Sequence, residues 1–435
     1  MGLTPDWGDF REELLKCSEQ LNTIFSDHVF KNAKALIEQT TSFPDRSVED
    51  FKYSDTSVFF DGERSFDAAP RNSDYKTAIP NLPFIYRIII VDGVFETDLS
   101  VLPDGLEIIP LDQLLNSNLS EFYHYLGNVS NVQNDLFCSI NTVHCANGNG
   151  IFLKKGLIID KPIAILNFIS GINKVQRNYS FPRLFLLAEE KSNANFLEIS
   201  IDLNPIMEKR QISVSEIVAL ENSRIGFYRI QKGNESLKQI VNLSVLVKNS
   251  AEVDTCTLSM ECEWVRNNLS VFLEGDHARA HLNGLFFTDK KQHSDMHTLV
   301  EHRAPFCNSN QIYKGILGGK SVGVFNGRIL VKSGAQKTNA YQSSKCILLG
   351  DDSTMNTKPQ LEIFADDVKC SHGSSTGEIS PDALFYLQSR GISTSEAKKL
   401  LVSAFANEVI NSISNDEVCD YFLEETKCIL QKFSL

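Results

Sequence analysis

The chain has 435 residues, of which 42% are hydrophobic, and a formal net charge of −13. Such a length can bury one large core or two to three ordinary ones, because domains usually hold about 100–200 residues. An acidic chain has no basic surplus to neutralise phosphates. We therefore expect neither a general nucleic-acid binder nor a protein that binds anionic membrane surfaces.

The amino terminus and the cysteines indicate the compartment. Residues Met1–Phe10 hold Asp6 and Asp9 and lack the basic start and apolar centre of a signal peptide. No later segment approaches about 18 uninterrupted apolar residues. The ten cysteines form no Cys-x-x-Cys pair, unlike a secreted disulfide framework or a zinc knuckle. We expect a cytoplasmic protein whose thiols are mostly reduced.

The first 82 residues are interpreted as a helical region with a connector. Apolar residues recur at helical spacing between Trp7 and Gln39, which predicts two amphipathic helices. The segment Thr40–Ile79 has no clear period and predicts a loop or an extended connector.

From about Pro83 to Cys370, short β-rich runs alternate with polar turns. One loose unit recurs, a polar or small pair followed by an alternating strand. Its copies begin roughly 27 to 44 residues apart, at Lys191, Glu221, Lys248, Gly275 and Gly319. Because no helical spacers of a doubly wound sheet intervene, we predict a stacked β-solenoid over residues 83–375, with a pair of β-sandwiches as the alternative. The terminal helical regions are candidates to cap its open ends.

Residues 376–435 return to a helical pattern. Ser380 and Pro381 open a first helix that ends at Gly391. A Ser-x-x-Glu capping box at 393–396 opens a second helix, and Asp416–Phe433 predicts a third. The predicted apolar face of the second helix consists of Ala397, Leu400, Leu401, Ala404, Phe405, Val409 and Ile413. This face either packs on the solenoid or receives a partner.

Two motifs resemble known sites without meeting their requirements. Gly315–Ser321 has three residues between its glycines where a P-loop needs four, and it continues as a strand, so we reject ATP binding by this chain. A second group places three histidines and two acidic residues close together. Its members are His293, Asp295, His297, Glu301 and His302. They would ligate a metal only if they converged, and hydrogen-bonded or exposed histidines are the favoured interpretation.

The pair Cys370 and His372 is a sharper candidate site. Residues two apart on a strand project from the same face, so thiolate and imidazole would point toward one ligand. This pairing suits a soft metal such as iron in a sulfur environment. Two ligands do not hold a cluster alone, so the others would come from elsewhere in the fold or from a partner chain. A buried thiol beside a hydrogen-bonded histidine is the alternative.

The stretch Lys358–Gly373, followed by Leu384–Ile392, resembles the carboxy-terminal signature of the SufB/SufD family of iron–sulfur cluster assembly proteins. Asp50–Tyr53 is similar to an amino-terminal Trp-Lys-Tyr element of that family, with Phe51 in place of Trp. Further blocks that look like the family occur in the right order at His297–His302, Gln311–Ile316 and Ala335–Thr338.

The resemblance implies a right-handed parallel β-helix between helical terminal regions. It also implies a non-ATPase scaffold subunit, not an enzyme, that pairs with a SufB-like paralogue and docks SufC-like ATPases. A homodimer is the alternative when the chain is alone. No tightly bound cofactor is expected, only a transient iron–sulfur cluster in the complex, and nothing in the sequence supports a flavin.

Residue roles follow from the matched motifs. Glycine after His372 and a serine at Ser344 favour the D-type, because SufB-like chains have glutamate and cysteine there. The resemblance implies that His372 lies at the interface where a cluster forms, with Cys370 beside it as a tentative shared metal ligand. Cys346 receives no role. The implied ATPase-binding residues are Leu384, Phe385, Tyr386, Leu387, Arg390, Gly391, Leu400 and Phe405.

Two other functions stay open. One is a purely structural adaptor, in which His372 only stabilises the fold. The other is a β-helical enzyme acting on polysaccharides, which would need a groove dense in carboxylates and basic residues. The sequence shows no such array.

Overall fold

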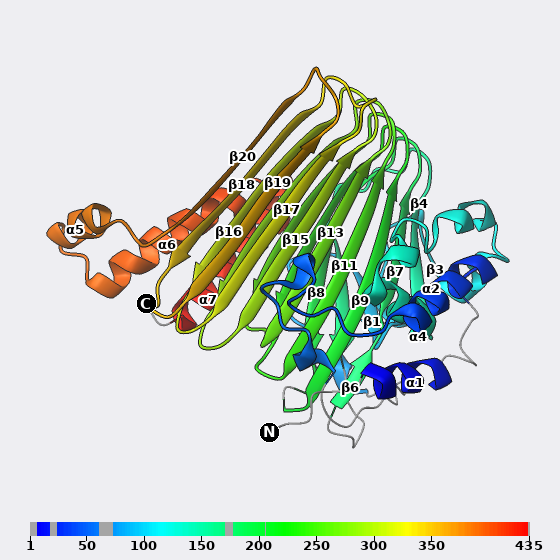
Figure 1. Ribbon diagram of the computed structural model, residues 1–435, viewed down its shortest axis with the longest axis horizontal. Helices are drawn as coiled ribbons and strands as arrows, with labels where there is room; N and C mark the ends of the chain where they lie inside the picture. Colours follow the sequence, from blue (N-terminus) through cyan, green and yellow to red (C-terminus); the bar gives the residue numbers. More distant parts are fainter. Residues whose placement is uncertain (1–6, 18–23, 61–72, 170–176, 205, 434–435) are drawn as a thin grey trace.

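The computed structural model describes residues 7–17, 24–60, 73–169, 177–204 and 206–433, and Figure 1 shows its arrangement. Two sheets, called A and B here, form the body of the protein. Sheet A holds β3 (Leu106–Pro110), β4 (Gly148–Leu153), β6 (Arg177–Ser180), β7 (Arg183–Ala188), β9 (Glu208–Ala219), β11 (Leu237–Val247), β13 (Trp264–Leu273), β15 (His293–His302), β17 (Val322–Val331) and β19 (Thr354–Ile363). Sheet B holds β1 (Tyr86–Val91), β2 (Val94–Val101), β5 (Ile163–Ile169), β8 (Asn193–Asp202), β10 (Arg224–Lys232), β12 (Glu252–Met260), β14 (Arg279–Thr288), β16 (Asn308–Leu317), β18 (Asn339–Leu348) and β20 (Lys369–Gly377).

From β7 onward the chain passes from one sheet to the other at every turn. Each strand pairs in parallel with the strand two places later, as β12 does with β14 and β14 with β16. The register does not shift, so residues at equal positions stack in rows along the body. The predicted parallel β-solenoid is confirmed, and the sandwich alternative is wrong.

The corners of the solenoid explain the repeat in the sequence. From β7 onward, at six of the seven corners between a strand of sheet A and the next strand of sheet B, one residue adopts a positive φ. These residues are Lys191, Asn222, Ser250, His277, Phe306 and Lys337. The first four predicted units are such corners, but the unit at Gly319 leads from sheet B back to sheet A. The long last interval therefore compared two different corners, and the corners at Phe306 and Lys337 were missed, although Lys337-Thr-Asn-Ala340 closely matches the unit Lys191-Ser-Asn-Ala194.

The lumen between the sheets is the main core. Every second residue of each strand points into it, which gives stacked rows such as that of Val253 on β12 and Ala280 on β14 in sheet B. The core extends from Ile88 on β1 to Cys346 on β18. Gly319, where φ is +56°, turns the chain so closely that a Cβ would lie 2.7 Å from the backbone nitrogen of Lys290. The chain then continues as strand β17, so this glycine serves a corner and not a P-loop.

Amino-terminal helices cover the outer face of sheet A. These are α1 (Trp7–Cys17) and α2 (Asp27–Gln39), joined by α3 (Leu111–Leu114) and α4 (Leu136–His144). Short 3₁₀ turns connect them: η2 (Glu49–Phe51), η3 (Ser57–Phe59), η4 (Ser73–Lys76), η5 (Ser120–Tyr125) and η6 (Val132–Asn134). The two predicted amino-terminal helices are present. The helical stretch 111–144 departs from the expectation that strands dominate from Pro83 onward.

A buried ion pair fastens this helical layer to sheet A. Arg183 Nη2 lies 2.5 Å from Glu216 Oε2, and both side chains are fully buried. Glu216 also accepts hydrogen bonds from the backbone N–H groups of Gly127 and Ser130. Because each charge is paired and further hydrogen-bonded, the network tolerates burial and fixes one position of the helical layer.

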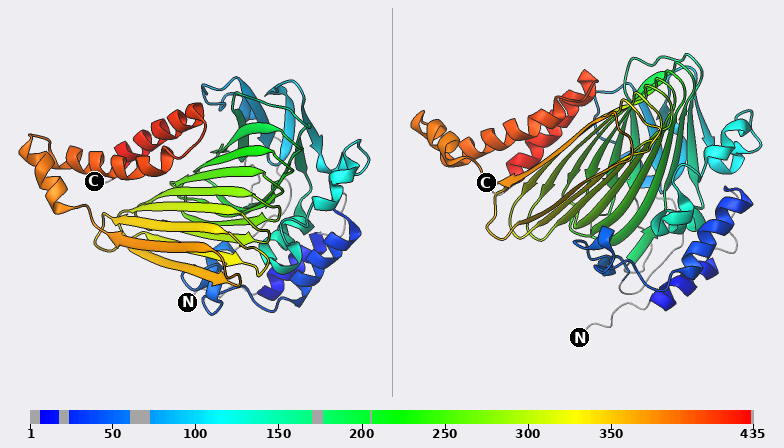
Figure 2. Two further views of the ribbon diagram at one scale, coloured as in Figure 1. Left: turned by 90° about the horizontal axis from the view of Figure 1, so that it is seen from above. Right: turned by 45° about the horizontal axis from the view of Figure 1, so that its top comes forward.

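Carboxy-terminal helices lie on the other side of the body. α6 (Thr394–Ile410) and α7 (Asp416–Lys432) pack on the outer face of sheet B, whereas α5 (Pro381–Ser389) projects away from the solenoid (Figure 2). The predicted capping box of Ser393 and Glu396 is present. The predicted apolar face of α6 was only partly right, because Leu400 is 52% exposed and the buried stripe includes Val402 and Ala406. No helix in the described ranges is long and apolar enough to cross a membrane.

The terminal helices cover faces of the solenoid and not its ends, so the expectation that they act as end caps is wrong. The first end is closed by the chain itself, since Phe95 of β2 and the following Leu102 pack against the lumen core. At the other end β19 and β20 are the last strands of their sheets, and the side chains of β20 are almost all exposed. This end offers two unpaired strand edges.

Candidate functional site

Cys370 and His372 lie on β20, at the open end of the solenoid. In the ladder with β18, Cys370 pairs with Ala340 and His372 pairs with Gln342. Cys370 packs against a small buried cluster that includes Ile329 and Ala340, so this row of β20 faces the lumen. The two side chains therefore share the inner face, as their spacing predicts, and His372 remains exposed because no further coil covers it.

The last coil has little apolar packing. Across the lumen, Ser374 Oγ of β20 donates a hydrogen bond to Thr357 Oγ1 of β19, at 3.0 Å. A Cβ on Gly373 or Gly377 would meet no other atom within 4 Å. The inner surface of the final turn thus presents a thiol, an imidazole and hydroxyl groups toward whatever adjoins the end.

The surroundings of the Cys370 thiol favour its protonated form. Partial burial raises its pKa, and a hydrogen bond with the backbone of Ala340 opposes this only in part. A metal ligand must be a thiolate, so binding of iron here would release a proton. Iron–sulfur clusters commonly take four protein ligands, of which this pair would supply two. Cys346, deeper in the lumen, is inert by comparison, because burial raises the pKa of its thiol to about 12.

The residues expected to bind an ATPase separate into two groups. Phe385, Tyr386 and Leu400 are 72%, 58% and 52% exposed, and α5 contains no buried residue. Arg390 stacks over the Tyr386 ring, at 5.3 Å from its centroid. Leu384 and Leu387 are half-buried, and Gly391, with φ +85°, ends α5.

Phe405 differs from this exposed group because it helps to anchor α6. The buried Lys314 of β16 donates hydrogen bonds to the Phe405 carbonyl at 2.7 Å and to Glu408 Oε2 at 2.5 Å. Its ammonium also lies 4.2 Å from the centroid of the Phe405 ring. Phe405 therefore joins α6 to the solenoid, and the free apolar surface consists of α5 and Leu400.

The histidine-rich strand β15 forms a hydrogen-bonded network. Asp295 accepts bonds from Ser54 Oγ at 2.5 Å and from Arg266 Nη1 at 2.9 Å, and His297 Nε2 lies 2.9 Å from Asp295 Oδ1. Burial alone would raise the pKa of Asp295, but the charges of His297 and Arg266 hold it well below its usual range. Arg266 also lies over the Phe51 ring, at 4.0 Å from its centroid. The network holds the 50–54 segment against sheet A, and the interpretation as hydrogen-bonded histidines is confirmed.

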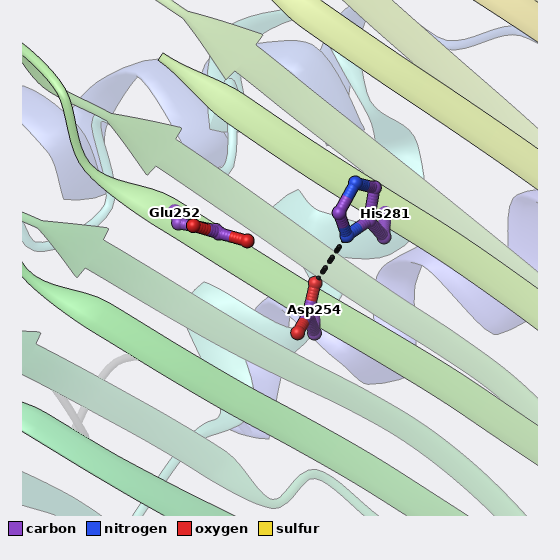
Figure 3. Close-up of side chains that lie close together, drawn as sticks. All are labelled: Glu252, Asp254 and His281. Atoms are coloured by element: carbon purple, nitrogen blue, oxygen red, sulfur yellow. Dashed lines mark hydrogen bonds and ion pairs between the residues drawn. The ribbon is translucent and has the colours of Figure 1, made fainter. Parts of the chain in front are cut away.

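The described residues contain one group of three side chains that could ligate a metal. This group lies on β12 and β14, apart from β15 and from the pair on β20. Glu252 and Asp254 of β12 and His281 of β14 place ligand atoms within 4.8 Å of one another on the outer face of sheet B (Figure 3). His281 Nδ1 lies 2.7 Å from Asp254 Oδ1, and this hydrogen bond raises the pKa of His281. Sequence reasoning missed the group because its members meet only through the β12–β14 register.

A cavity of about 1130 Å³ lies on the outer face of sheet A beneath the amino-terminal segment. Neither Cys370 nor His372 lines it. Four carboxylates line it, those of Asp50, Asp135, Glu274 and Glu301, and the two glutamates form ion pairs with Arg303. The two glutamates are thus engaged with a cation.

His302 points into the lumen and predicts a pH dependence of stability. It is fully buried, its Nε2 lies 2.9 Å from Ser309 Oγ, and burial lowers its pKa to about 4. Between about pH 4 and its ordinary value near 6.5, the unfolded chain binds a proton that the folded chain does not. The contribution of His302 to stability is therefore fully present above this window. Inside the window the free energy of unfolding decreases as the pH is lowered, by at most roughly 3 kcal/mol from this residue.

Urea unfolding between pH 7 and pH 4.5 checks this expectation. His302→Gln cannot bind the proton, so its unfolding free energy should depend less steeply on pH than that of the wild type. Equal slopes for the two proteins would contradict the assignment.

Comparison with known proteins identifies the family. Residues 170–405 match the SufBD core domain of SUF system FeS cluster assembly, and residues 17–165 match the SufBD protein N-terminal region. Protein ABCI7, chloroplastic, from Arabidopsis thaliana is 30% identical over 404 residues, covering 90% of this chain and 83% of that protein. Iron-sulfur cluster assembly protein SufD from Escherichia coli is 27% identical over 380 residues, covering 86% of each chain.

Two SufBD family proteins from Synechocystis also match, at 27% identity over 337 residues and 26% over 341 residues. The first match covers 75% of this chain and 74% of the relative, and the second covers 76% and 69%. The fold and the matches together define a protein of the iron–sulfur cluster assembly class. The chain belongs to the SufBD family.

Proposed function

We propose that this chain is the D-type scaffold subunit of a Suf-type assembly complex and that it is not itself an enzyme. The observation that carries the proposal is the open end of the solenoid, where Cys370 and His372 face the lumen from an exposed edge strand. A nascent iron–sulfur cluster, as cargo, takes His372 and Cys370 as two of its ligands. The remaining ligands come from the partner chain.

The partner at this end is a SufB-like paralogue. β19 and β20 each leave one strand edge without a neighbour, and an edge of this length is covered in stable proteins. A second solenoid of the same fold presents matching edges, so its strands extend both sheets across the junction. The two family members in Synechocystis are consistent with a pairing of paralogues within one organism.

The ATPase partner, SufC-like, binds the exposed surface of α5 and α6. Phe385, Tyr386 and Leu400 form an apolar surface next to the cationic Arg390, a composition typical of interface centres. ATP turnover is then supplied by the partner. This agrees with the finding that Gly319 forms a corner of the solenoid and not a P-loop.

Affinity purification of the tagged chain from its native cells tests the proposal. We expect recovery of a SufB-like paralogue and an ATPase together with this chain. Recovery of the chain alone, or as a homodimer, would favour the structural adaptor instead.

A further inference from the structure

Gln342 of β18 is fully buried, yet neither atom of its carboxamide has a hydrogen-bond partner within the described parts of the chain. Burial of an amide without partners is unfavourable, so such a group needs an explanation, for example a bound water or ion or a role at a functional site. The proposed function gives the Gln342 carboxamide no role at the open end of the solenoid.

The register places this amide directly beside the candidate site. Gln342 and His372 are Cα partners in the parallel ladder of β18 and β20, so both side chains point into the lumen one strand apart. The opposite wall leaves room for the amide, because a Cβ on Gly327 of β17 would lie 1.8 Å from Gln342 Nε2. The carboxamide thus spans the lumen immediately beneath the last coil.

The next residue down the same row is engaged through one atom only. Gln311 of β16 pairs with Gln342 in the ladder, and its Oε1 accepts a hydrogen bond from Thr298 Oγ1 at 2.7 Å, whereas its Nε2 is buried without a partner in the described structure. His372, on the upper side, has no hydrogen bond to its ring in the described structure. The free carboxamide oxygen and the free imidazole are therefore neighbours.

We propose that Gln342 is the positioning residue for His372. Its Oε1 accepts a hydrogen bond from the ring N–H that faces the lumen, which fixes the tautomer and leaves the other ring nitrogen, with its lone pair, facing the cluster. Histidines that bind metals are commonly held in this way, and loss of the supporting group lowers metal affinity by about 10- to 100-fold. The role in assembly rests on the proposed function, whereas the contact itself does not.

The contact is tested in the full-length chain with ¹⁵N-labelled histidine, using His372→Ala to assign the ring signals. We expect wild-type His372 to show one dominant tautomer. Gln342→Leu should give averaged ring shifts, and Gln342→Glu, which keeps an acceptor, should retain the wild-type tautomer. Gly327→Ala should resemble Gln342→Leu because the new methyl group displaces the amide.

Gln311→Leu is the matched control, since it removes an equally buried carboxamide one coil deeper. It should leave the His372 signals unchanged. Identical His372 shifts in wild type and Gln342→Leu overturn the inference, as does an equal effect of Gln311→Leu.

The cluster content of the purified complex separates this inference from the proposed function. We expect Gln342→Leu to lower it about tenfold. A changed tautomer in Gln342→Leu, combined with normal cluster content in a His372→Ala complex, would support the contact and overturn the role of His372 in assembly. Normal content in Gln342→Leu alone would overturn the positioning role.

Discussion

His372→Ala is expected to leave the complex assembled but nearly unable to build a cluster. The side chain is exposed, and the proposed hydrogen bond to Gln342 is its one polar contact within the chain, so its loss should change the free energy of unfolding by about 1 kcal/mol or less. Removing one of two ligands on this chain leaves Cys370 alone at the junction. Cluster formation is measured by visible absorbance when ferrous iron and sulfide are supplied to the complex anaerobically.

The matched control is His281→Ala, which removes a half-buried imidazole from the outer face of the same sheet. It should retain wild-type cluster formation. Loss of cluster formation in His281→Ala and not in His372→Ala would instead assign the site to the group formed with Glu252 and Asp254 (Figure 3).

The double variant Phe385→Ser/Leu400→Ser should lose the ATPase while keeping the fold. Neither side chain contributes to a buried core, so the melting temperature should stay close to that of the wild type. Apolar residues at an interface centre contribute about 2 kcal/mol or more each, and loss of both lowers affinity by about 100-fold or more. Isothermal titration of the chain with the purified ATPase measures the effect.

Ile206→Ser serves as the control, because Ile206 is 91% exposed and lies far along the chain from α5. It should bind the ATPase as the wild type does. Full binding by the double variant would show that the ATPase uses another surface.

Local signals in the sequence predicted the elements that depend on local chemistry. The capping box of α6 and the Pro381 start of α5 are set by hydrogen bonds within a few residues, and both are present. The solenoid was recognisable because one unit repeats. The unit at Gly319 was grouped with the other four because corners from sheet A to sheet B and corners from sheet B to sheet A can both contain a residue with positive φ. The sequence pattern does not tell which sheet follows such a corner.

Features that depend on contacts between distant residues were not predictable in this way. The buried stripe of α6 is set by its contact with sheet B, which buries Val402 and Ala406 and leaves Leu400 exposed. The terminal helices do not cap the solenoid because they dock on the outer faces of its two sheets. No periodic pattern in the sequence indicates either docking position.

The candidate site shows the same division. The shared face of Cys370 and His372 follows from their spacing on a strand, whereas the position of that strand at an uncovered end required the structure. Gln342 carries no motif, and only the β18–β20 register brings it beneath His372.

The most direct test of the account is the iron and acid-labile sulfide content of the native complex, purified anaerobically through a tag on this chain. The account predicts both elements in stoichiometric amounts with a paralogue and an ATPase present, and their loss in the His372→Ala complex. A complex of the same composition that holds neither element, or that holds equal amounts without His372, would contradict it.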